Sequence, residues 1–171
     1  SLLASMELEL NNTGNDLPAG TLIAGTELVT AIPGGLRISG NAELAIADFV
    51  SLSGAFAFEH DDKATADASD DVIRVAAQEI NAFLGASNVA GLAISDGTLG
   101  LIVQKVGENA KYAMVASGVA ELRGLGEHIL LQGAVDVRVN TTGATVNESI
   151  EVPTEPNPTL QQIVFDSNSL F

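Results

Sequence analysis

Alternation of apolar and polar residues is the dominant pattern along this chain, and it predicts β-strands. An apolar residue at every second position places one set of side chains on a buried face and the other set toward solvent. Such runs occur at residues 6–10, 42–46, 52–58 and 135–139. They predict an all-β fold.

Glycine-containing breaks separate these runs at short intervals. The breaks are Pro33-Gly34-Gly35, Ser39-Gly40, Asp96-Gly97, Gly107-Glu108-Asn109, Ser117-Gly118 and Gly124-Leu125-Gly126. Closely spaced turn signals favour antiparallel neighbours, because a parallel crossover needs about a dozen residues or more. We therefore expect short, mostly antiparallel strands in an elongated module, arranged as a sandwich, a twisted sheet or a solenoid-like prism.

One segment, residues 70–85, also fits a helix. Its apolar residues include positions 72, 73, 76, 80, 83 and 84. An aspartate stands at its start and a glycine at its end, and both are helix boundary signals. The β-branched residues within 72–75 favour a strand instead. From the local pattern alone the helix is slightly favoured, and the fold holds at most one short helix near 72–84.

A motif at the start of the chain recurs near its end. Residues 2–14 match residues 131–143, an offset of 131 − 2 = 129, and both copies close on Asn-x-Thr-Gly. Recurrence at a fixed period is typical of modular repeats. We expect residues 1–14 to end a preceding repeat unit, 15–143 to form one full period, and 144–171 to form a proline-containing linker and the start of the next unit.

A second, shorter similarity lies inside this period. Residues 39–44 match 117–122, and residues 52–58 match 131–137 after a slip of one residue. Each half of the period therefore contains a strand, a turn and a second strand that begins with Leu-x-Gly. This two-strand unit is expected to be used twice per period.

Composition narrows the partners. The net charge of −15 disfavours nucleic acid and anionic membrane surfaces, which both attract Lys and Arg. The chain has no cysteine, which excludes disulfides and thiolate metal sites. No apolar run is long enough to cross a bilayer as a helix. We expect neighbouring repeats of the same chain as partners, no nucleic acid and no membrane insertion.

Four motifs carry a resemblance to a known class of proteins. They are Leu-Ser-Gly-x-Phe-x-Phe at 52–58, Ile-Asn-Ala-Phe-Leu-Gly at 80–85, Ile-Ser-Asp-Gly-Thr-Leu-Gly-Leu at 94–101 and Val-Asn-Thr-Thr-Gly at 139–143. With these motifs the chain resembles tandem repeats of very large bacterial secreted or cell-surface proteins, often described as hemolysin-type calcium-binding or adhesin-like.

This resemblance implies an extracellular, calcium-rich setting and a role as one segment of a long stalk or surface layer. It also implies a strand at 72–77 and a short helical turn at about 80–84. The glycine- and aspartate-rich nonapeptides that bind calcium in hemolysin-type proteins are absent from this chain. No calcium ligand is therefore carried over from the family to a residue here.

A cluster of aspartates is the candidate metal site. Clustered carboxylates suit Ca²⁺, which takes oxygen ligands. The candidate ligands are Asp61, Asp62, Asp67, Asp70 and Asp71. Their spacing fits no EF-hand loop, and a solvated acidic hairpin loop is the alternative interpretation.

Catalytic chemistry is not expected. His60 and Asp61 are the residue types of an acid/base couple, but neighbours in a strand point to opposite faces. His128, the other histidine, has no nucleophile pattern around it. The Asn-x-Thr sequences at Asn11 and Asn140 are interpreted as turn formers whose side chains bond the local backbone.

These observations predict a non-catalytic structural or adhesive repeat module of a large extracellular bacterial protein, which provides length and surface presentation. The alternative is a calcium- or carbohydrate-binding β module. Sugar-binding faces usually display exposed Trp or Tyr, and Tyr112 is the only such residue in the chain.

Overall fold

The computed structural model describes residues 1–28, 31–32, 34–46, 50–61, 70–86, 90–106, 109–124, 131–166 and 169–170. Within these residues the secondary structure is all β, with no helix. The strands are β1 (Leu2–Asn11), β2 (Leu22–Ile23), β3 (Thr26–Glu27), β4 (Gly35–Ile46), β5 (Val50–Asp61), β6 (Val72–Ala86), β7 (Ala90–Val106), β8 (Asn109–Arg123), β9 (Leu131–Asn140), β10 (Val146–Val152), β11 (Thr159–Phe165) and β12 (Ser169–Leu170).

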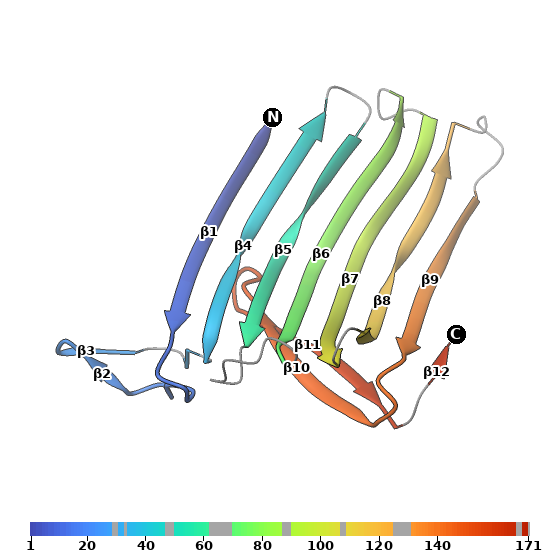
Figure 1. Ribbon diagram of the computed structural model, residues 1–171. Coiled ribbons are helices and arrows are strands. Elements are labelled where there is room, and N and C mark those ends of the chain that lie inside the picture. Colours follow the sequence, from blue (N-terminus) through green and yellow to red (C-terminus); the bar gives the residue numbers. More distant parts are fainter. Residues whose placement is uncertain are drawn as a thin grey trace.

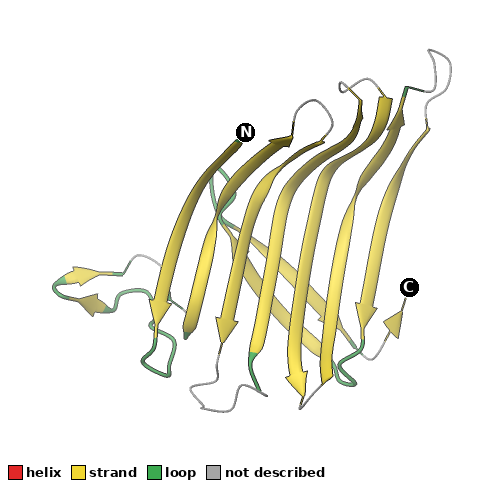
Figure 2. Cartoon of the chain, turned by 45° about the horizontal axis from the view of Figure 1, so that its top comes forward, coloured by secondary structure: helices red, strands yellow, loops and turns green. Residues whose placement is uncertain are grey.

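Eight of these strands form one open antiparallel sheet in the order β1-β4-β5-β6-β7-β8-β9-β12 (Figure 1). From β4 to β9 the chain runs back and forth between adjacent strands. The β2–β3 hairpin projects from the side of the sheet, and the β10–β11 hairpin crosses the long strands on one face (Figure 2). The expected antiparallel all-β fold is therefore confirmed, in the form of a single sheet with a crossing hairpin.

The long strands are longer than the glycine breaks indicated, up to 17 residues in β7. Three of the expected breaks, Ser39-Gly40, Asp96-Gly97 and Ser117-Gly118, lie inside strands. Their glycines serve close packing instead of turns. A Cβ on Gly97 would lie 2.9 Å from the Cβ of Ile80 on the neighbouring strand, and a Cβ on Gly40 would collide with the carbonyl oxygen of Ser5.

The helical turn expected at 80–84 is wrong, because β6 continues as a strand through this segment to Ala86. A β-bulge explains the misleading pattern. Between the pairs Ala77↔Leu99 and Ile80↔Gly97, β6 has one more residue than β7, and Glu79 there has a φ of 56°. The extra residue shifts the alternation by one. The buried residues Ala76 and Phe83 consequently stand at a spacing that imitates a helix.

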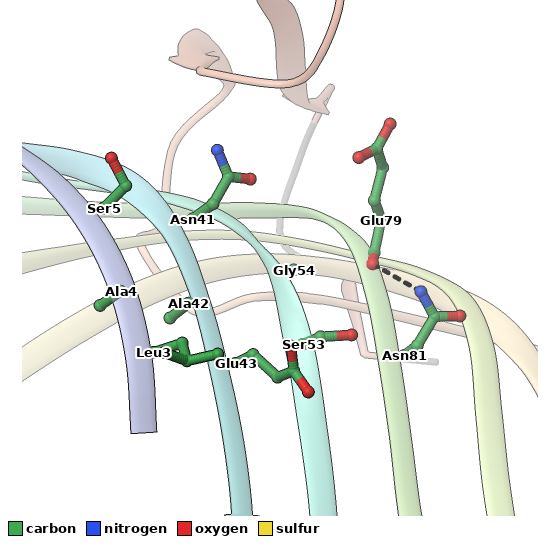
Figure 3. A pocket seen from close by; sticks show the side chains of 10 residues that line it. All are labelled: Leu3, Ala4, Ser5, Asn41, Ala42, Glu43, Ser53, Gly54, Glu79 and Asn81. Atoms are coloured by element: carbon green, nitrogen blue, oxygen red, sulfur yellow. Dashed lines mark hydrogen bonds between the residues drawn. The ribbon is translucent and has the colours of Figure 1, made fainter. Parts of the chain in front are cut away.

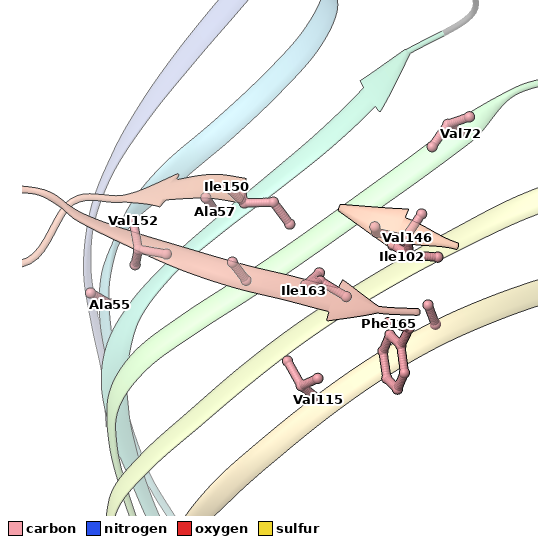
Figure 4. Close-up of a cluster of buried hydrophobic side chains, with 12 residues drawn as sticks. Ala55, Ala57, Val72, Ile102, Val115, Val146, Ile150, Val152, Ile163 and Phe165 are labelled. Atoms are coloured by element: carbon pink, nitrogen blue, oxygen red, sulfur yellow. The ribbon is translucent and has the colours of Figure 1, made fainter. Parts of the chain in front are cut away.

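The core lies between the sheet and the β10–β11 hairpin, on what we call the hairpin face of the sheet (Figure 4). The sheet contributes mostly small side chains, of which Ala57, Ala76 and Ala113 are fully buried, together with the larger Ile102. The hairpin contributes larger ones, with Ile150 and Ile163 also fully buried. Small residues on the sheet let the hairpin approach closely, so that the two layers exclude water.

Residues 144–171, which were expected to form a linker, contain the β10–β11 hairpin that packs on the sheet. Their prolines are confined to the connection between β10 and β11, at Pro153, Pro156 and Pro158. The strands on either side alternate, with Val146, Ile150 and Val152 buried in the first and Ile163 and Phe165 in the second. Among the described residues, this segment supplies the apolar cover of the hairpin face.

The opposite side of the sheet, the open face, carries a continuous apolar surface. The register places one row of facing residues straight across seven strands: Leu8, Ile38, Phe58, Val75, Leu101, Met114 and Val139. Exposed residues in the same phase are Leu2, Met6, Leu10, Ile46, Leu52, Leu84, Leu92, Ile94, Tyr112, Leu122, Leu131 and Val135.

The motif shared by the two ends of the chain has the same structure in both copies. β1 spans Leu2–Asn11 and β9 spans Leu131–Asn140, so both bounds differ by 131 − 2 = 140 − 11 = 129. β4 pairs with the end of β1 through Asn11↔Gly35 and Leu10↔Leu36. β12 pairs with the end of β9 in the same way, through Asn140↔Ser169 and Val139↔Leu170.

The shorter internal similarity also has a structural counterpart. In the β4–β5 pair, Ala42 faces Gly54 and Leu44 faces Leu52. In the β8–β9 pair, the matching residues Ala120 and Gly133, and Leu122 and Leu131, face each other. The two similar sequence pairs therefore form two antiparallel strand pairs with the same register.

Candidate functional site

A charged cleft lies between the edge half of the sheet and the β10–β11 hairpin, with a volume of ≈ 490 Å³. Arg37 of β4 is at its centre, and its side chain is 9% exposed. The register places Glu9, Arg37, Glu59 and Arg74 in one row on the hairpin face, so that charges of opposite sign alternate across four strands. Opposite charges on directly facing strand positions attract each other.

Arg37 joins the sheet to the hairpin. Its Nη1 donates to Glu9 Oε2 at 3.1 Å, and its Nη2 donates to the carbonyl oxygen of Glu151 at 3.0 Å. Its Nε lies 3.7 Å from Glu59 Oε1 and is buried without a hydrogen-bond partner. One guanidinium therefore holds carboxylates of β1 and β5 and the backbone of β10 together.

Arg74 makes a second connection to the hairpin. Its Nε donates to Glu148 Oε2 of β10 at 3.3 Å, and its Nη1 lies 3.5 Å from Asp61 Oδ2. The Arg74 side chain is 16% exposed, whereas that of Glu148 is 41% exposed. The cleft thus ends in a more open ion pair on its hairpin side.

Burial raises the pKa of Glu59 above its ordinary value of 4.5. The positive charges of Arg37 and Arg74 lower the pKa, and the negative charges of Glu148 and Glu9 raise it further. Loss of hydration outweighs the attraction of the two arginines, as expected for a carboxyl group between a sheet and a covering hairpin.

The candidate metal ligands do not converge in the part of the chain that the structure describes. Asp71 Oδ2 lies 3.0 Å from His60 Nε2, and Asp61 contacts Arg74. Asp70 stands just before β6, while Asp62 and Asp67 lie outside the described residues. Among the residues that are described, no group of three or more His, Cys, Asp or Glu side chains is arranged to hold a metal ion.

Of the two histidines, one lies within the described residues. The structure places His60 against Asp71, which precedes β6. The antiparallel pairing of β5 with β6 brings these two residues together, although they are 11 positions apart in the sequence. His128 lies outside the described residues.

A polar hollow of ≈ 530 Å³ lies on the hairpin face (Figure 3). One of its lining residues, Asn41, donates a 3.4 Å hydrogen bond from Nδ2 to the carbonyl oxygen of Pro153, in the connection between β10 and β11. Its lining residues come from β1, β4, β5 and β6: Leu3, Ala4, Ser5, Asn41, Ala42, Glu43, Ser53, Gly54, Glu79 and Asn81. The carbonyl oxygen of Glu79, at the bulge, accepts a 3.0 Å hydrogen bond from Asn81 Nδ2. Hydroxyl, amide and carboxylate groups line an open depression that suits hydrated polar ligands.

The Asn-x-Thr sequences at Asn11 and Asn140 form turns, as predicted. Asn140 is 1% exposed, and its Oδ1 accepts hydrogen bonds from the backbone N–H and the hydroxyl of Thr142. Its Nδ2 donates to the carbonyl oxygen of Ala144 at 2.9 Å. The side chain therefore closes the loop that follows β9 and is turned away from solvent.

Reasoning from the sequence missed the charged cleft. The sequence does contain a sign of this cleft. Arg37 and Arg74 are two of only seven basic residues, and both occupy polar positions of alternating strands. Their partners, however, are Glu9 and Glu148, which lie 28 and 74 residues away in the sequence.

Tyr112, the one candidate for stacking against a sugar, is 39% exposed and lies on the open face.

No helix among the described residues is long and apolar enough to cross a membrane. No protein-family model, curated protein or solved structure matches the chain. The structural similarity of β1 to β9, and of β4 to β12, therefore carries the functional argument.

Proposed function

We propose that this chain is a non-catalytic structural repeat module of a large extracellular bacterial protein, in which successive units extend one β-sheet and give length and surface presentation. The observation that carries the proposal is the agreement between β1 and β9. Both have the same length, the same bounds after a shift of 129 and the same closing turn. Modular repetition is the simplest origin of such agreement.

The start of β12 supports the same proposal. Ser169 and Leu170 occupy on β9 the positions that Gly35 and Leu36 occupy on β1. A strand equivalent to β4 therefore begins at the far side of β9. In a tandem array the next unit adds its strands edge to edge, so that the sheet continues from one unit into the next.

The two hairpins fit this arrangement. Leu17 pairs with Ile32 in the segment that contains β2 and β3, and the equivalent position Val146 begins the β10–β11 hairpin. The second hairpin covers the strands that precede it in the chain. By the same relation β2–β3 would lie over the strands of a preceding unit, and its Leu22 is 70% exposed here.

A chain of two joined units tests the proposal. Leu170 is joined directly to Arg37, so that the two-residue strand β12 continues as a second β4. Arg138 takes the place of Glu9 on β9, and the fusion therefore carries Arg138→Glu to keep Arg37 opposite a carboxylate. We expect one cooperative urea transition at a higher midpoint than that of the single chain, because the units share a sheet interface.

The matched control joins Leu170 to Ile38 instead. A shift of one residue turns every side chain of the joined strand to the opposite face of the sheet. This fusion should unfold at a lower midpoint than the first, with the two halves no longer coupled. Equal midpoints for the two fusions would contradict the proposal.

A binding module is the second candidate, and the polar hollow is the observation that favours it. Glu43 and Glu79 line this hollow together with hydroxyl and amide groups. Calorimetric titration with Ca²⁺ and a glycan array distinguish the two functions. Saturable heat, or a glycan signal that disappears in Glu43→Gln, would establish a binding role; the structural proposal predicts neither.

A further inference from the structure

The open face of the sheet is an apolar surface without cover. Leu8 of β1 is 67% exposed, Leu52 of β5 is 45% exposed and Val135 of β9 is 47% exposed. These residues come from both sides and the middle of the sheet, so the exposed apolar surface spans its full width. Apolar patches of more than a few hundred square ångströms are uncommon on monomers and mark interaction surfaces.

Charge is almost absent from this face. Two β-bulges interrupt the alternation, at Glu79 of β6 and at Asp96 of β7. Outside these bulges, the described strand residues in the phase of the row from Leu8 to Val139 include two that can carry a charge, His60 and Lys105. Both stand at the same end of the sheet, near the connections that follow β5 and β7. Outside the bulges, the acidic residues of the long strands alternate onto the hairpin face, so most of the negative charge on these strands does not oppose close contact through the open face.

The size of the open face matches that of a stable interface. Seven strands at about 4.8 Å spacing, each with about ten residues at about 3.3 Å, cover roughly 1,100 Å². A stable protein interface buries about 800 Å² on each partner. The area therefore suffices for a specific complex formed through this face alone.

Neighbouring units along the chain do not provide this cover. This step rests on the proposed function, in which β12 begins the next unit at the edge of β9. Units added edge to edge widen the open face. The crossing hairpins pack on the opposite side of the sheet, where Ile150 and Ile163 are buried. The open face is therefore left available for packing against another copy of the chain.

We propose that the open face packs against the same face of a second copy of this chain, which produces a two-layered β-sandwich. Both partners are apolar and carry almost no charge at the contact, and sheets pack face to face about 10 Å apart. The open face is not flat, because two hollows of ≈ 240 Å³ each flank Ile80 and can accept side chains of a partner. Their linings are almost entirely apolar and receive branched side chains from the facing sheet.

Sedimentation velocity of the 171-residue chain over a range of concentrations tests this proposal. We expect a reversible dimer. Leu52→Glu and Val135→Glu should each weaken the dimer by about 100-fold or more, because each dimer would bury two unpaired carboxylates. Both side chains are exposed in the single chain, so these variants should keep the far-ultraviolet circular dichroism of the unmodified protein.

Matched controls place the same charge on neighbouring positions of the other face. Ser51→Glu adjoins Leu52, and Ala134→Glu adjoins Val135; both should leave the dimer constant within about threefold. A chain that stays monomeric at all concentrations overturns the proposal, whether or not it binds phosphatidylcholine vesicles. A dimer that all four variants weaken equally also overturns it. Neither result affects the two-unit fusion, which reports on edge-to-edge contact.

Discussion

Asn11 and Asn140 adopt the same hydrogen-bonding arrangement at the ends of two strands that are separated by the width of the sheet. Each Oδ1 accepts a 2.7 Å hydrogen bond from a threonine hydroxyl two residues later. Each Nδ2 donates to a backbone carbonyl four residues later, at 2.8 and 2.9 Å. The same local sequence thus produces the same turn in two places, which makes the turn a property of the motif.

Removal of the Asn140 side chain should be costly. Asn140→Ala leaves the backbone N–H of Thr142, which is buried, and the carbonyl of Ala144 without this partner. We expect the free energy of unfolding to fall by about 1–3 kcal/mol, as measured by urea denaturation. Asn147→Ala, at an exposed position of β10, is the control and should change it by less than about 0.5 kcal/mol.

Arg37 should be the most sensitive charged residue. Arg37→Met leaves the largely buried carboxylates of Glu9 and Glu59 without their cation. The free energy of unfolding should fall by about 3 kcal/mol. Arg123→Met, whose side chain is 44% exposed, is the control and should cost less than about 0.5 kcal/mol. Addition of Glu59→Gln to Arg37→Met should recover part of the loss, and no recovery would contradict this explanation.

Stability should depend on pH through Glu59. Because burial raises its pKa above the ordinary 4.5, the folded protein holds this proton more tightly than the unfolded chain does. Its contribution to stability is then fully present below the ordinary pKa and is lost as the pH rises through the folded-state pKa. The glutamine of Glu59→Gln does not titrate. The free energy of unfolding of this variant should therefore increase relative to that of the unmodified protein as the pH rises.

Urea denaturation from about pH 4 to about pH 8 measures this difference. The control is Glu7→Gln, which removes one charge from an exposed position of β1. A constant difference between Glu59→Gln and the unmodified protein across this range would show that Glu59 is not the titrating group.

Gly40 and Gly118 stand at matching positions of similar sequences, and their substitution should have different effects. A Cβ on Gly40 would collide with the backbone of Ser5, whereas a Cβ on Gly118 would have its nearest neighbour, the Cα of Gly97, at 3.3 Å. Gly40→Ala should therefore cost about 2–4 kcal/mol and Gly118→Ala less than about 1 kcal/mol. Hydrogen exchange would locate the loss, since Gly40→Ala should expose the amides of β1. Equal costs would contradict the contact with Ser5.

Local alternation was sufficient to predict much of this fold. The run at 52–58 forms part of β5 because a half-buried strand leaves its period in the sequence itself. The bulge at Glu79 could not be predicted from the same alternation, because it changes the phase of the pattern. One inserted residue shifts the phase between Ala76 and Phe83, and a short window cannot distinguish such a shift from helical spacing. The prolines of residues 144–171 indicated a linker, although the segments that form β10 and β11 on either side of them alternate.

The charged cleft was beyond local reasoning. Glu9, Arg37 and Glu59 meet only when three strands are paired in the observed register, and no adjacent residues encode that register. The contact of Arg37 with the backbone of Glu151 depends in addition on how the hairpin crosses the sheet. Long-range placement of this kind follows from the whole fold.

The pairing of β12 with β9 has a mechanical consequence for an array of such units. Six strands per period at about 4.8 Å spacing advance a row of units by only about 29 Å, at right angles to the strands. At roughly 20–25° of twist between neighbours, each period also rotates by roughly a third of a turn or more. A tensile load along this axis pulls strands apart sideways, so their hydrogen bonds rupture one after another, as in a zipper. Such an array would extend under tension strand by strand.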